Sequence, residues 1–257
     1  MTTGKRGVIR RALTRHRVLH GGTYNLEISR DVDVVVAEVV TLMREQDLDF
    51  LTVCEASTYV GALVKSARRG GQLHKAGCRV LAYPRRGIPA RETAIVVRRR
   101  AHGGPGARWK RLHWITRLKW ERSPNNRGKG MGDHPGRRSV SAWVAWCRVL
   151  AVHTTPGPFG PEYPKRHAAN LDCFAHQTRI AKRWAGSLFS RRAVMPGDWN
   201  RHPNDPVVAD MVDATGWSTH GDGIDWVLAH GVHVSNMRRI KFGGSDHDPV
   251  LFDLEPA

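Results

Sequence analysis

The stretch RRAVMPGDWN, residues 191–200, joins a short apolar run to a single carboxylate and an amide. Short apolar runs bounded by turn residues are typical of β-strands, so we expect a strand over residues 193–198. Asp198 then stands at the end of this strand, and Asn200 lies in the turn that follows. Side chains in such positions either cap the turn or project into a pocket.

The same arrangement of one acid beside an apolar strand recurs along the chain. Glu55 follows DFLTVC (49–54), Asp225 lies within GIDWVL (223–228), and Asp246 precedes HDPVLFDL (247–254). Carboxylates that converge on one pocket repel each other unless a cation neutralises them. Because oxygen-only ligands favour a hard ion, Mg²⁺ or Mn²⁺ is expected rather than Zn²⁺.

Further hydrophobic patterns predict many short strands and only a few helices. Strands are expected at 17–26, 49–54, 79–83, 93–98, 112–118, 224–228 and 249–254, with one or two more within 140–153. Helices are expected at 34–44, 58–67 and 162–189. This composition predicts an α/β sandwich with the sheets inside and the helices outside. We expect one domain over residues 17–257, after a basic N-terminal extension at 1–16.

Length and composition restrict the class of protein. A chain of 257 residues with 40% hydrophobic residues suits one large domain with a sizeable core. No run approaches the roughly 18 to 20 apolar residues of a membrane-spanning helix, and no signal-peptide pattern follows the basic N-terminus. The four cysteines form no Cys-x-x-Cys pair, which favours a reduced, cytoplasmic compartment. Neither a membrane nor an obligate protein partner is indicated.

The charge balance favours a polyanionic partner. Lys and Arg number 41 against 23 Asp and Glu, a net charge of +18, and nucleic acid is the commonest polyanion in a cell. Of the 41 basic residues 32 are Arg, a skew that a GC-rich coding sequence explains as easily as binding does. The charge therefore favours nucleic acid without settling the question.

Much of this charge lies in a basic segment, residues 98–138, which we interpret as a loop insertion. It holds 13 Lys or Arg and two acids. Trp109, Trp114 and Trp120 stand among its cations, as suits stacking on bases and contacts to phosphates. The alternative is that the tryptophans face the core and the cations face water. The expected nucleic-acid contacts, several of them in an exposed loop over 121–137, are Arg111, Arg117, Lys119, Arg122, Arg127, Lys129, Arg137 and Arg138.

Six short motifs, in order along the chain, resemble those of the endonuclease/exonuclease/phosphatase superfamily, which includes deoxyribonuclease I and exonuclease III. They are TYNL (23–26), VCEAS (53–57), LAVHTT (150–155), GDWN (197–200), GIDWVL (223–228) and SDHDP (245–249). The resemblance implies a four-layer α/β/β/α sandwich with two packed, mostly antiparallel sheets. Tyr24, Cys54 and Trp199 depart from the usual Trp, Gln and Phe, but each is a neighbour of a presumed catalytic group.

The resemblance also implies a metal site. Glu55 would be the principal ligand of Mg²⁺ or Mn²⁺, helped by Asp246 and by Asn25. Because neighbours alternate on a strand, we expect Cys54 to point away from the pocket if Glu55 points into it.

The catalytic roles implied by the resemblance fall on histidines and acids. Asp198 and Asn200 would position the attacking water and the scissile phosphate. His247, oriented by Asp225, would act as a general base or as a cation on the phosphate. His153 would protonate the leaving oxygen or stabilise charge in the transition state. A looser alignment proposes Glu92 as the acid that orients His153.

These roles leave three functions open. A metal-dependent nuclease that hydrolyses DNA or RNA is the first interpretation. A phosphatase or phosphodiesterase on inositol phosphates or lipid headgroups would use the same centre. A basic nucleic-acid-binding module without catalysis would require a substituted Glu55, Asp198 or His247, and all three are present.

Overall fold

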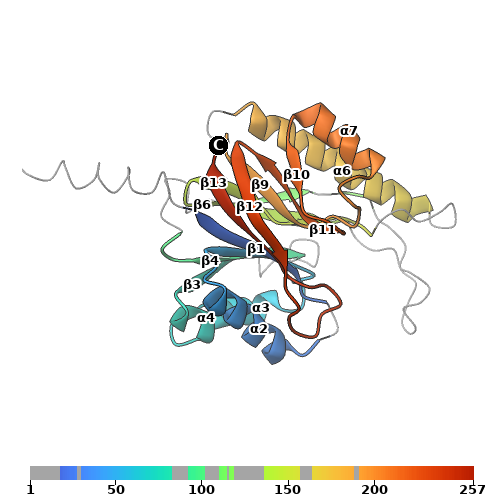
Figure 1. Cartoon of the computed structure of the whole chain (residues 1–257). Helices are drawn as coiled ribbons and strands as arrows, with labels where there is room; N and C mark the ends of the chain where they lie inside the picture. The colour runs from blue at the N-terminus through green and yellow to red at the C-terminus, as the bar shows by residue number, and fades with distance from the viewer. Residues whose placement is uncertain are drawn as a thin grey trace, which may run out of the picture.

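The computed structural model describes residues 18–27, 30–82, 92–101, 110–114, 116–118, 136–156, 164–187 and 191–257. The basic extension at 1–16 lies outside these ranges. Two β-sheets pack face to face, and helices cover the outer face of each (Figure 1). The predicted α/β/β/α sandwich is therefore confirmed.

The first sheet has the strand order β12-β13-β1-β2-β4-β3. Its strands are β1 (Leu19–Asn25), β2 (Phe50–Cys54), β3 (Cys78–Leu81), β4 (Thr93–Arg98), β12 (Val232–Arg239) and β13 (Val250–Pro256). Its helices are α2 (Val32–Glu45), α3 (Val60–Ser66) and α4 (Gln72–Lys75). Helix α2 begins where the Asp31 side chain accepts hydrogen bonds from two backbone amides, and its apolar face, including Val35, Val39 and Leu42, is buried.

The second sheet has the order β10-β11-β9-β7-β6-β5, with β8 beside β9. Its strands are β5 (Lys110–Trp114), β6 (Arg138–Val144), β7 (Cys147–Leu150), β8 (Val152–His153), β9 (Ala193–Asp198), β10 (Ser218–His220) and β11 (Asp225–His230). Helices α6 (Pro164–Ala185) and α7 (Pro206–Thr215) cover it. The run 140–153 thus belongs to three strands rather than one or two: the chain turns between β6 and β7 at Ala145, which has a φ of 48°, and β8 follows β7 after Ala151.

Four elements were not predicted, namely the short α4 and β10 together with α7 and β12. Helix α7 has clear boundary signals, with Asp205 capping its start, Pro206 as its first residue and Gly216 in the left-handed conformation after its end. Strand β12 lies at the edge of its sheet and is mostly polar, so it lacks the alternation that reveals a strand.

Parallel strand pairing is confined, among the described strands, to the pairs β1–β2, β7–β9 and β8–β9. Helix α2 connects the first pair and helix α6 the others, as parallel neighbours require a crossover connection. Parallel strands end at the same edge of a sheet. Asn25 therefore lies opposite Cys54 in one sheet, and His153 lies opposite Asp198 in the other.

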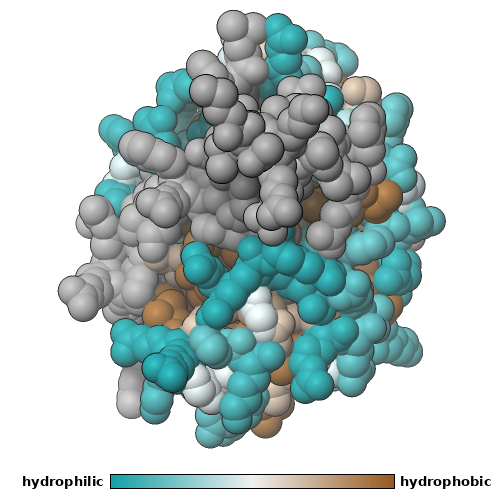
Figure 2. Space-filling model, turned by 90° about the vertical axis from the view of Figure 1, so that its left-hand side faces the viewer, coloured by the Kyte–Doolittle hydropathy of each residue, from teal (hydrophilic) through white to brown (hydrophobic). Residues whose placement is uncertain are grey.

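The sheets meet in a core that includes Phe50 and Phe252, whose rings pack edge to face with centroids 5.9 Å apart. Gly21 admits this packing, because a Cβ there would lie 2.5 Å from the Phe50 ring. Figure 2 shows a face on which most described side chains are hydrophilic. Among the described helices, none combines the length and apolar character that crossing a membrane requires.

The described part of the basic segment is divided between the sheets, because Arg98 ends β4 in the first sheet and residues 110–114 belong to the second. Residues 110–114 form its edge strand β5, paired with β6 so that Trp114 lies opposite Arg138. Residues 112–114 of the strand expected at 112–118 thus lie in β5, and the loop insertion stays a prediction. Arg137 is only 6% exposed, so the expectation that it lies in an exposed loop is wrong.

Candidate active site

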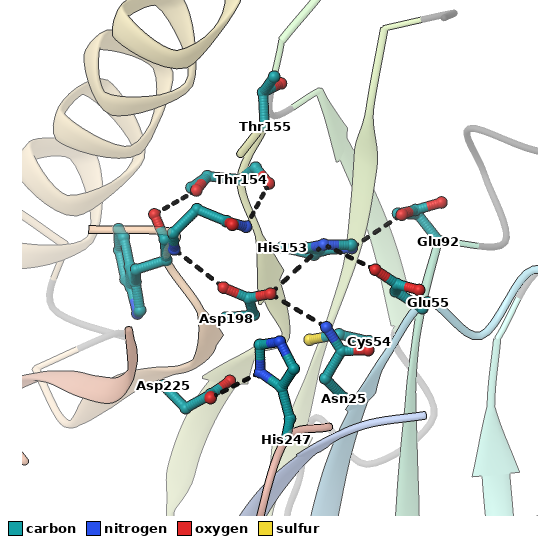
Figure 3. A network of polar contacts seen from close by, with 12 residues as sticks. Asn25, Cys54, Glu55, Glu92, His153, Thr154, Thr155, Asp198, Asp225 and His247 are labelled. Carbon is teal, nitrogen blue, oxygen red and sulfur yellow. Dashed lines mark hydrogen bonds and ion pairs between the residues drawn. The ribbon is translucent and has the colours of Figure 1, made fainter. Parts of the chain in front are cut away.

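The acids and histidines singled out in the sequence gather where the ends of both sheets meet (Figure 3). The carboxyl ends of β1, β2, β8 and β9 lie at this edge. Two antiparallel strands begin there, so that Asp225 at the start of β11 lies opposite Asp198 and Thr93 at the start of β4 lies opposite Cys54. The residue before β4 is Glu92. Strand register thus brings residues from six strands to one place.

His153 lies at the centre of this group and is 1% exposed. Its Nδ1 is 2.7 Å from Oε1 of Glu92, the acid proposed to orient it. Its Nε2 faces the other acids, 3.6 Å from Oδ2 of Asp198 and 3.8 Å from Oε1 of Glu55. The ring therefore has one nitrogen against a buried carboxylate and one directed into the site.

Arg137 supports the Glu92 side of this arrangement. Its Nη1 lies 3.6 Å from Glu92 Oε1 and donates a 2.7 Å hydrogen bond to the carbonyl oxygen of Thr154. A buried guanidinium beside a buried carboxylate balances its charge. Arg137 is therefore a buried residue that contacts Glu92 and Thr154 beside the site, and the sequence did not predict this position.

Asp198 is held by two hydrogen bonds. Its Oδ2 accepts one of 3.0 Å from the Asn25 amide, and its Oδ1 accepts one of 2.9 Å from the Asn200 backbone N–H. Asn200 has a φ of 52°, and its side-chain amide donates to the Thr154 carbonyl over 3.0 Å. Burial raises the pKa of Asp198, and Asp225 adds to this rise, whereas the charges of His153 and His247 oppose it.

The two tryptophans beside these acids fix the turn. The Trp199 ring stacks on the Trp226 ring with centroids 4.3 Å apart, and its Nε1 donates to the Trp226 carbonyl over 3.2 Å. Trp199 separates Asp198 from Asn200, and Trp226 follows Asp225. The stack therefore joins the turn after β9 to the start of β11.

His247 is the second histidine of the site. Its Nδ1 is 2.8 Å from Oδ2 of Asp225. Burial alone would lower the pKa of His247, but the hydrogen bond and charge of Asp225, together with the charges of Asp198 and Asp246, raise it to about 9. The imidazole is therefore a cation at neutral pH.

The loop that carries His247 is tied to β1 by a serine. Ser245 Oγ donates to the Asn25 carbonyl over 2.8 Å, and the backbone N–H of His247 donates to Ser245 Oγ over 3.2 Å. The serine of SDHDP thus links the last motif of the chain to the first.

A second tie comes from a group of polar side chains under the same loop. The backbone N–H of Gly244 donates to Glu38 Oε1 over 3.3 Å, and the Tyr24 hydroxyl donates to Glu38 Oε2 over 3.0 Å. Arg30 pairs with the same carboxylate and donates to the Tyr24 hydroxyl. Burial, and next the charge of Glu38, raise the pKa of Tyr24 to about 12. Tyr24, the departure from the usual Trp, thus uses its hydroxyl to hold the loop.

Cys54 lies at the floor of the site, contrary to expectation. Strand β2 ends at Cys54, and Glu55 has a φ of 52°, so the alternation of a strand does not extend to it. The buried thiol donates to the Val152 carbonyl over 2.9 Å. Burial, followed by the charge of Asp198, raises its pKa well above the ordinary value, so it stays a neutral thiol.

The predicted metal ligands supply only oxygen donors, which fits Mg²⁺ or Mn²⁺. Glu55 is partly exposed and faces His153, and Asn25 Oδ1 accepts from the Glu27 N–H over 3.2 Å with a further lone pair to offer. Asp246 is largely exposed, with Oδ1 4.0 Å from His247 Nε2.

A second arrangement could also hold a cation. Ligand atoms of Asp198, Asp225 and His247 lie within 4.8 Å of one another. Nδ1 of His247 is already directed at Asp225, which leaves Nε2 as its donor. The oxygen donors of Glu55, Asn25 and Asp246 remain the ligands predicted for a hard cation.

The predicted nucleic-acid contacts are only partly described. Arg111 and Arg117 are exposed, and the Arg138 guanidinium lies 3.6 Å from the centroid of the Trp114 ring. Lys119, Arg122, Arg127 and Lys129 lie outside the described residues.

No protein-family model and no curated protein matches the sequence. Solved structures do match over almost the whole chain. An endonuclease/exonuclease/phosphatase protein from Bacteroides vulgatus is 14% identical with a TM-score of 0.61, covering 94% of this chain and 100% of its own. ANGEL2, a 2′,3′-cyclic phosphatase, is 11% identical with a TM-score of 0.62, covering 94% and 96%.

The mannosyl-6-phosphatase Bt3783 of Bacteroides thetaiotaomicron is also similar, at 14% identity and a TM-score of 0.56, covering 92% of this chain and 99% of its own. The chain therefore has the fold of the endonuclease/exonuclease/phosphatase superfamily. The resemblance predicted from the six motifs is confirmed at the level of the fold.

Proposed function

We propose that this protein is a divalent-metal-dependent phosphodiesterase whose substrate is nucleic acid. The observation that carries the proposal is the pair of histidines, each against its own carboxylate, on either side of Asp198. Glu92 lies 2.7 Å from His153, and Asp225 lies 2.8 Å from His247. Hydrolysis of a phosphodiester requires one proton to be removed and another to be supplied, and paired histidines suit this need.

The geometry favours a distinct role for each histidine. His247 lies among Asp225, Asp198 and Asp246 and is held as a cation, which suits contact with a phosphate oxygen rather than proton abstraction. His153 directs Nε2 into the site and is placed to protonate the leaving oxygen. Asp198, with its carboxylate oriented by two hydrogen bonds, would position the attacking water, and Asn200 would contact the phosphate.

Glu55, Asn25 and Asp246 would hold the metal. The bound cation would polarise the phosphoryl oxygen and lower the pKa of a bound water. The fit rests on the oxygen-only donors and on the exposure of Glu55 toward the same space that His153 faces.

Nucleic acid is favoured as the substrate by the net charge of +18 and by the arginines around Trp114, which suit phosphates and bases. A phosphomonoesterase is the second candidate, because a mannosyl-6-phosphatase shares the fold. Inositol phosphates and lipid headgroups belong to the same alternative.

The test is hydrolysis of labelled single-stranded DNA, duplex DNA and RNA, with Mg²⁺, with Mn²⁺ and with EDTA. A nitrophenyl phosphodiester, a nitrophenyl phosphomonoester and an inositol phosphate are assayed in parallel. The variants are Asp198→Ala and, as a control, Asp213→Ala, which removes an exposed carboxylate from α7.

We expect metal-dependent cleavage of at least one polymer and of the diester, lost with EDTA and in Asp198→Ala but retained in the control. Removal of one such group typically lowers the rate by a factor of about 10² or more. Hydrolysis of the monoester alone would replace the proposal with the second candidate. Binding without hydrolysis of any substrate would leave only the binding module.

A further inference from the structure

Helix α6 carries a row of polar side chains along the border that it shares with β5. Asp172, His176, Arg179 and Arg183 follow one another at helical spacing, so they lie along one side of the helix. The row begins near the active site, where the amide of Asn170 donates to the Thr155 carbonyl over 2.7 Å.

Strand β5 and the residues after it run along this row in a fixed register. Asp172 Oδ2 accepts hydrogen bonds from Thr116 Oγ1 over 2.6 Å and from the Arg117 N–H over 3.3 Å. Further along, the His113 and Trp184 rings have centroids 6.0 Å apart. Residues 116 and 117 therefore lie beside Asp172 and His113 lies beside Trp184, so β5 and α6 run in opposite directions.

At the far end of this border, Trp184 lies between contributions from three elements: Arg183 precedes it on α6, and Arg111 is two residues from His113 on β5, whose ring faces Trp184. The Arg148 guanidinium from β7 lies 4.0 Å from the centroid of the Trp184 ring. Burial, and then the charges of Arg111 and Arg183, lower the pKa of Arg148 to about 10. Burial and the same three arginines lower the pKa of His113 to about 3. The cations thus repel one another, and a bound anion would relieve this repulsion.

At the near end the row reaches the active site. The Arg117 guanidinium lies 5.7 Å from the centroid of the Trp114 ring, which the Arg138 guanidinium also covers. Arg138 follows Arg137, whose Nη1 lies 3.6 Å from Glu92. Next along the row, His176 Nε2 lies 3.6 Å from Asp172 Oδ2, and burial and the charges of Arg179 and Arg117 act to lower the pKa of His176.

We infer that these arginines form a basic track that binds the sugar-phosphate backbone of a nucleic acid outside the catalytic centre. The track consists of Arg117, Arg179, Arg111, Arg183 and Arg148. This inference rests on the proposed nucleic-acid substrate and extends it to a second contact surface on the β5–α6 border.

The dimensions fit this ligand. At 1.5 Å per residue, the helix from residue 172 to residue 183 is about 16 Å long. One strand of a duplex presents a phosphate about every 3.4 Å of its axis, so the track spans about five phosphates. Basic residues in the last turn of α6 also balance the helix dipole, which accounts for Arg183. The helix dipole does not account for Arg111 of β5 and Arg148 of β7, because neither residue belongs to α6.

The test compares two triple variants in an Asp198→Ala background, which prevents cleavage during binding. The track variant is Arg111→Gln, Arg179→Gln and Arg183→Gln, and all three side chains are exposed. The control is Arg44→Gln, Lys75→Gln and Arg79→Gln, exposed residues of α2, α4 and β3 on the opposite helical side of the sandwich. Both variants lose three positive charges, so long-range attraction changes equally.

Binding of a labelled strand of about 20 nucleotides and of the matching duplex is measured from about 50 to about 300 mM salt. Each lost phosphate contact flattens the slope of log K against log salt by about 0.7 to 0.9, so the track variant should flatten it by about 2 to 3. We expect a change of less than about 1 in the control, and weakening of about tenfold or more at the lowest salt in the track variant only.

Equal slopes for the two triple variants overturn the inference. If circular dichroism shows that the track variant is unfolded, Arg179→Gln and Arg183→Gln are measured singly, each with an expected change of about 0.7 to 0.9. A flattened slope together with no hydrolysis by the wild type would refute the proposed function but not the track. Hydrolysis by the wild type, together with a salt dependence that the track variant leaves unchanged, would refute the track but not the proposed function.

Discussion

The pairing of His247 with Asp225 makes a prediction that a single substitution tests. The pKa of His247 rises from 6.5 to about 9, and at 1.36 kcal/mol per unit this corresponds to about 3 kcal/mol in favour of the cation. Burial opposes the rise, and Asp225 supplies the largest contributions to it. In Asp225→Asn the charge is lost, so the pKa of His247 should fall by about two units, to near its ordinary value of 6.5.

The assay is an NMR titration of the histidine ring signals in metal-free protein, with His247→Gln used to assign the resonance. The matched control is Asp222→Asn, which removes an exposed carboxylate, 3.5 Å from Arg239, from the turn just before Asp225 and should change the pKa by only a few tenths. If the pKa in Asp225→Asn stays within about half a unit of the wild-type value, the pairing is not the cause of the shift and the electrostatic argument for His247 fails.

The same pairing predicts a pH dependence of stability. Because the folded pKa is raised, the stabilisation of about 3 kcal/mol is fully present below pH 6.5 and is lost as pH rises to about 9. In EDTA, His247→Gln should therefore lower the free energy of unfolding more at pH 6 than at pH 9.5, as urea titrations would measure. An equal loss at both values would contradict the linkage.

Three further predictions concern the supports of the site. Gly197→Ala should destabilise the protein by about 3 kcal/mol, because its Cβ would lie 2.0 Å from the Val152 carbonyl oxygen; a urea titration that finds less than 1 kcal/mol would show that the strands separate easily. Glu38→Gln should lower the melting temperature by several degrees in a thermal scan, since it weakens the tie to the Gly244 N–H, and an unchanged value would exclude that role. Glu92→Gln should lower kcat on a diester by about tenfold or more with little change in KM, and steady-state kinetics with an unchanged kcat would remove Glu92 from the mechanism.

The sequence predicts the strand ends well because apolar runs end where single acids begin. Asp198 and Asp225 stand at such ends, and the structure places them opposite each other in adjacent strands. The fold class follows from many short strands among few helices, and the motif order is what connects it to a known superfamily. Neither pattern required knowledge of distant contacts.

Long-range packing is what the sequence could not supply. In the sequence Arg137 is indistinguishable from the other cations of the basic segment. In the structure it is buried against Glu92, because it directly precedes β6, which begins at Arg138. Cys54 was expected to point away from the site because alternation was extended past the end of β2, where the positive φ of Glu55 breaks it. The Asp205, Pro206 and Gly216 signals of α7 were readable, and caps of this kind are a local source of information about helices.

The position of the site follows from the two crossover connections. An antiparallel sandwich alone would carry successive strand ends to alternate edges, so Asn25 and Glu55 would lie apart. Helix α2 returns the chain so that β1 and β2 end together, and helix α6 does the same for β8 and β9. Helix α6 therefore has two roles, one in the fold and one that we infer in substrate binding. It brings His153 beside Asp198, and its border with β5 carries the arginines that we infer to hold the substrate backbone. Substitutions on its exposed side should then change the affinity for long polyanions without changing the register that builds the catalytic centre.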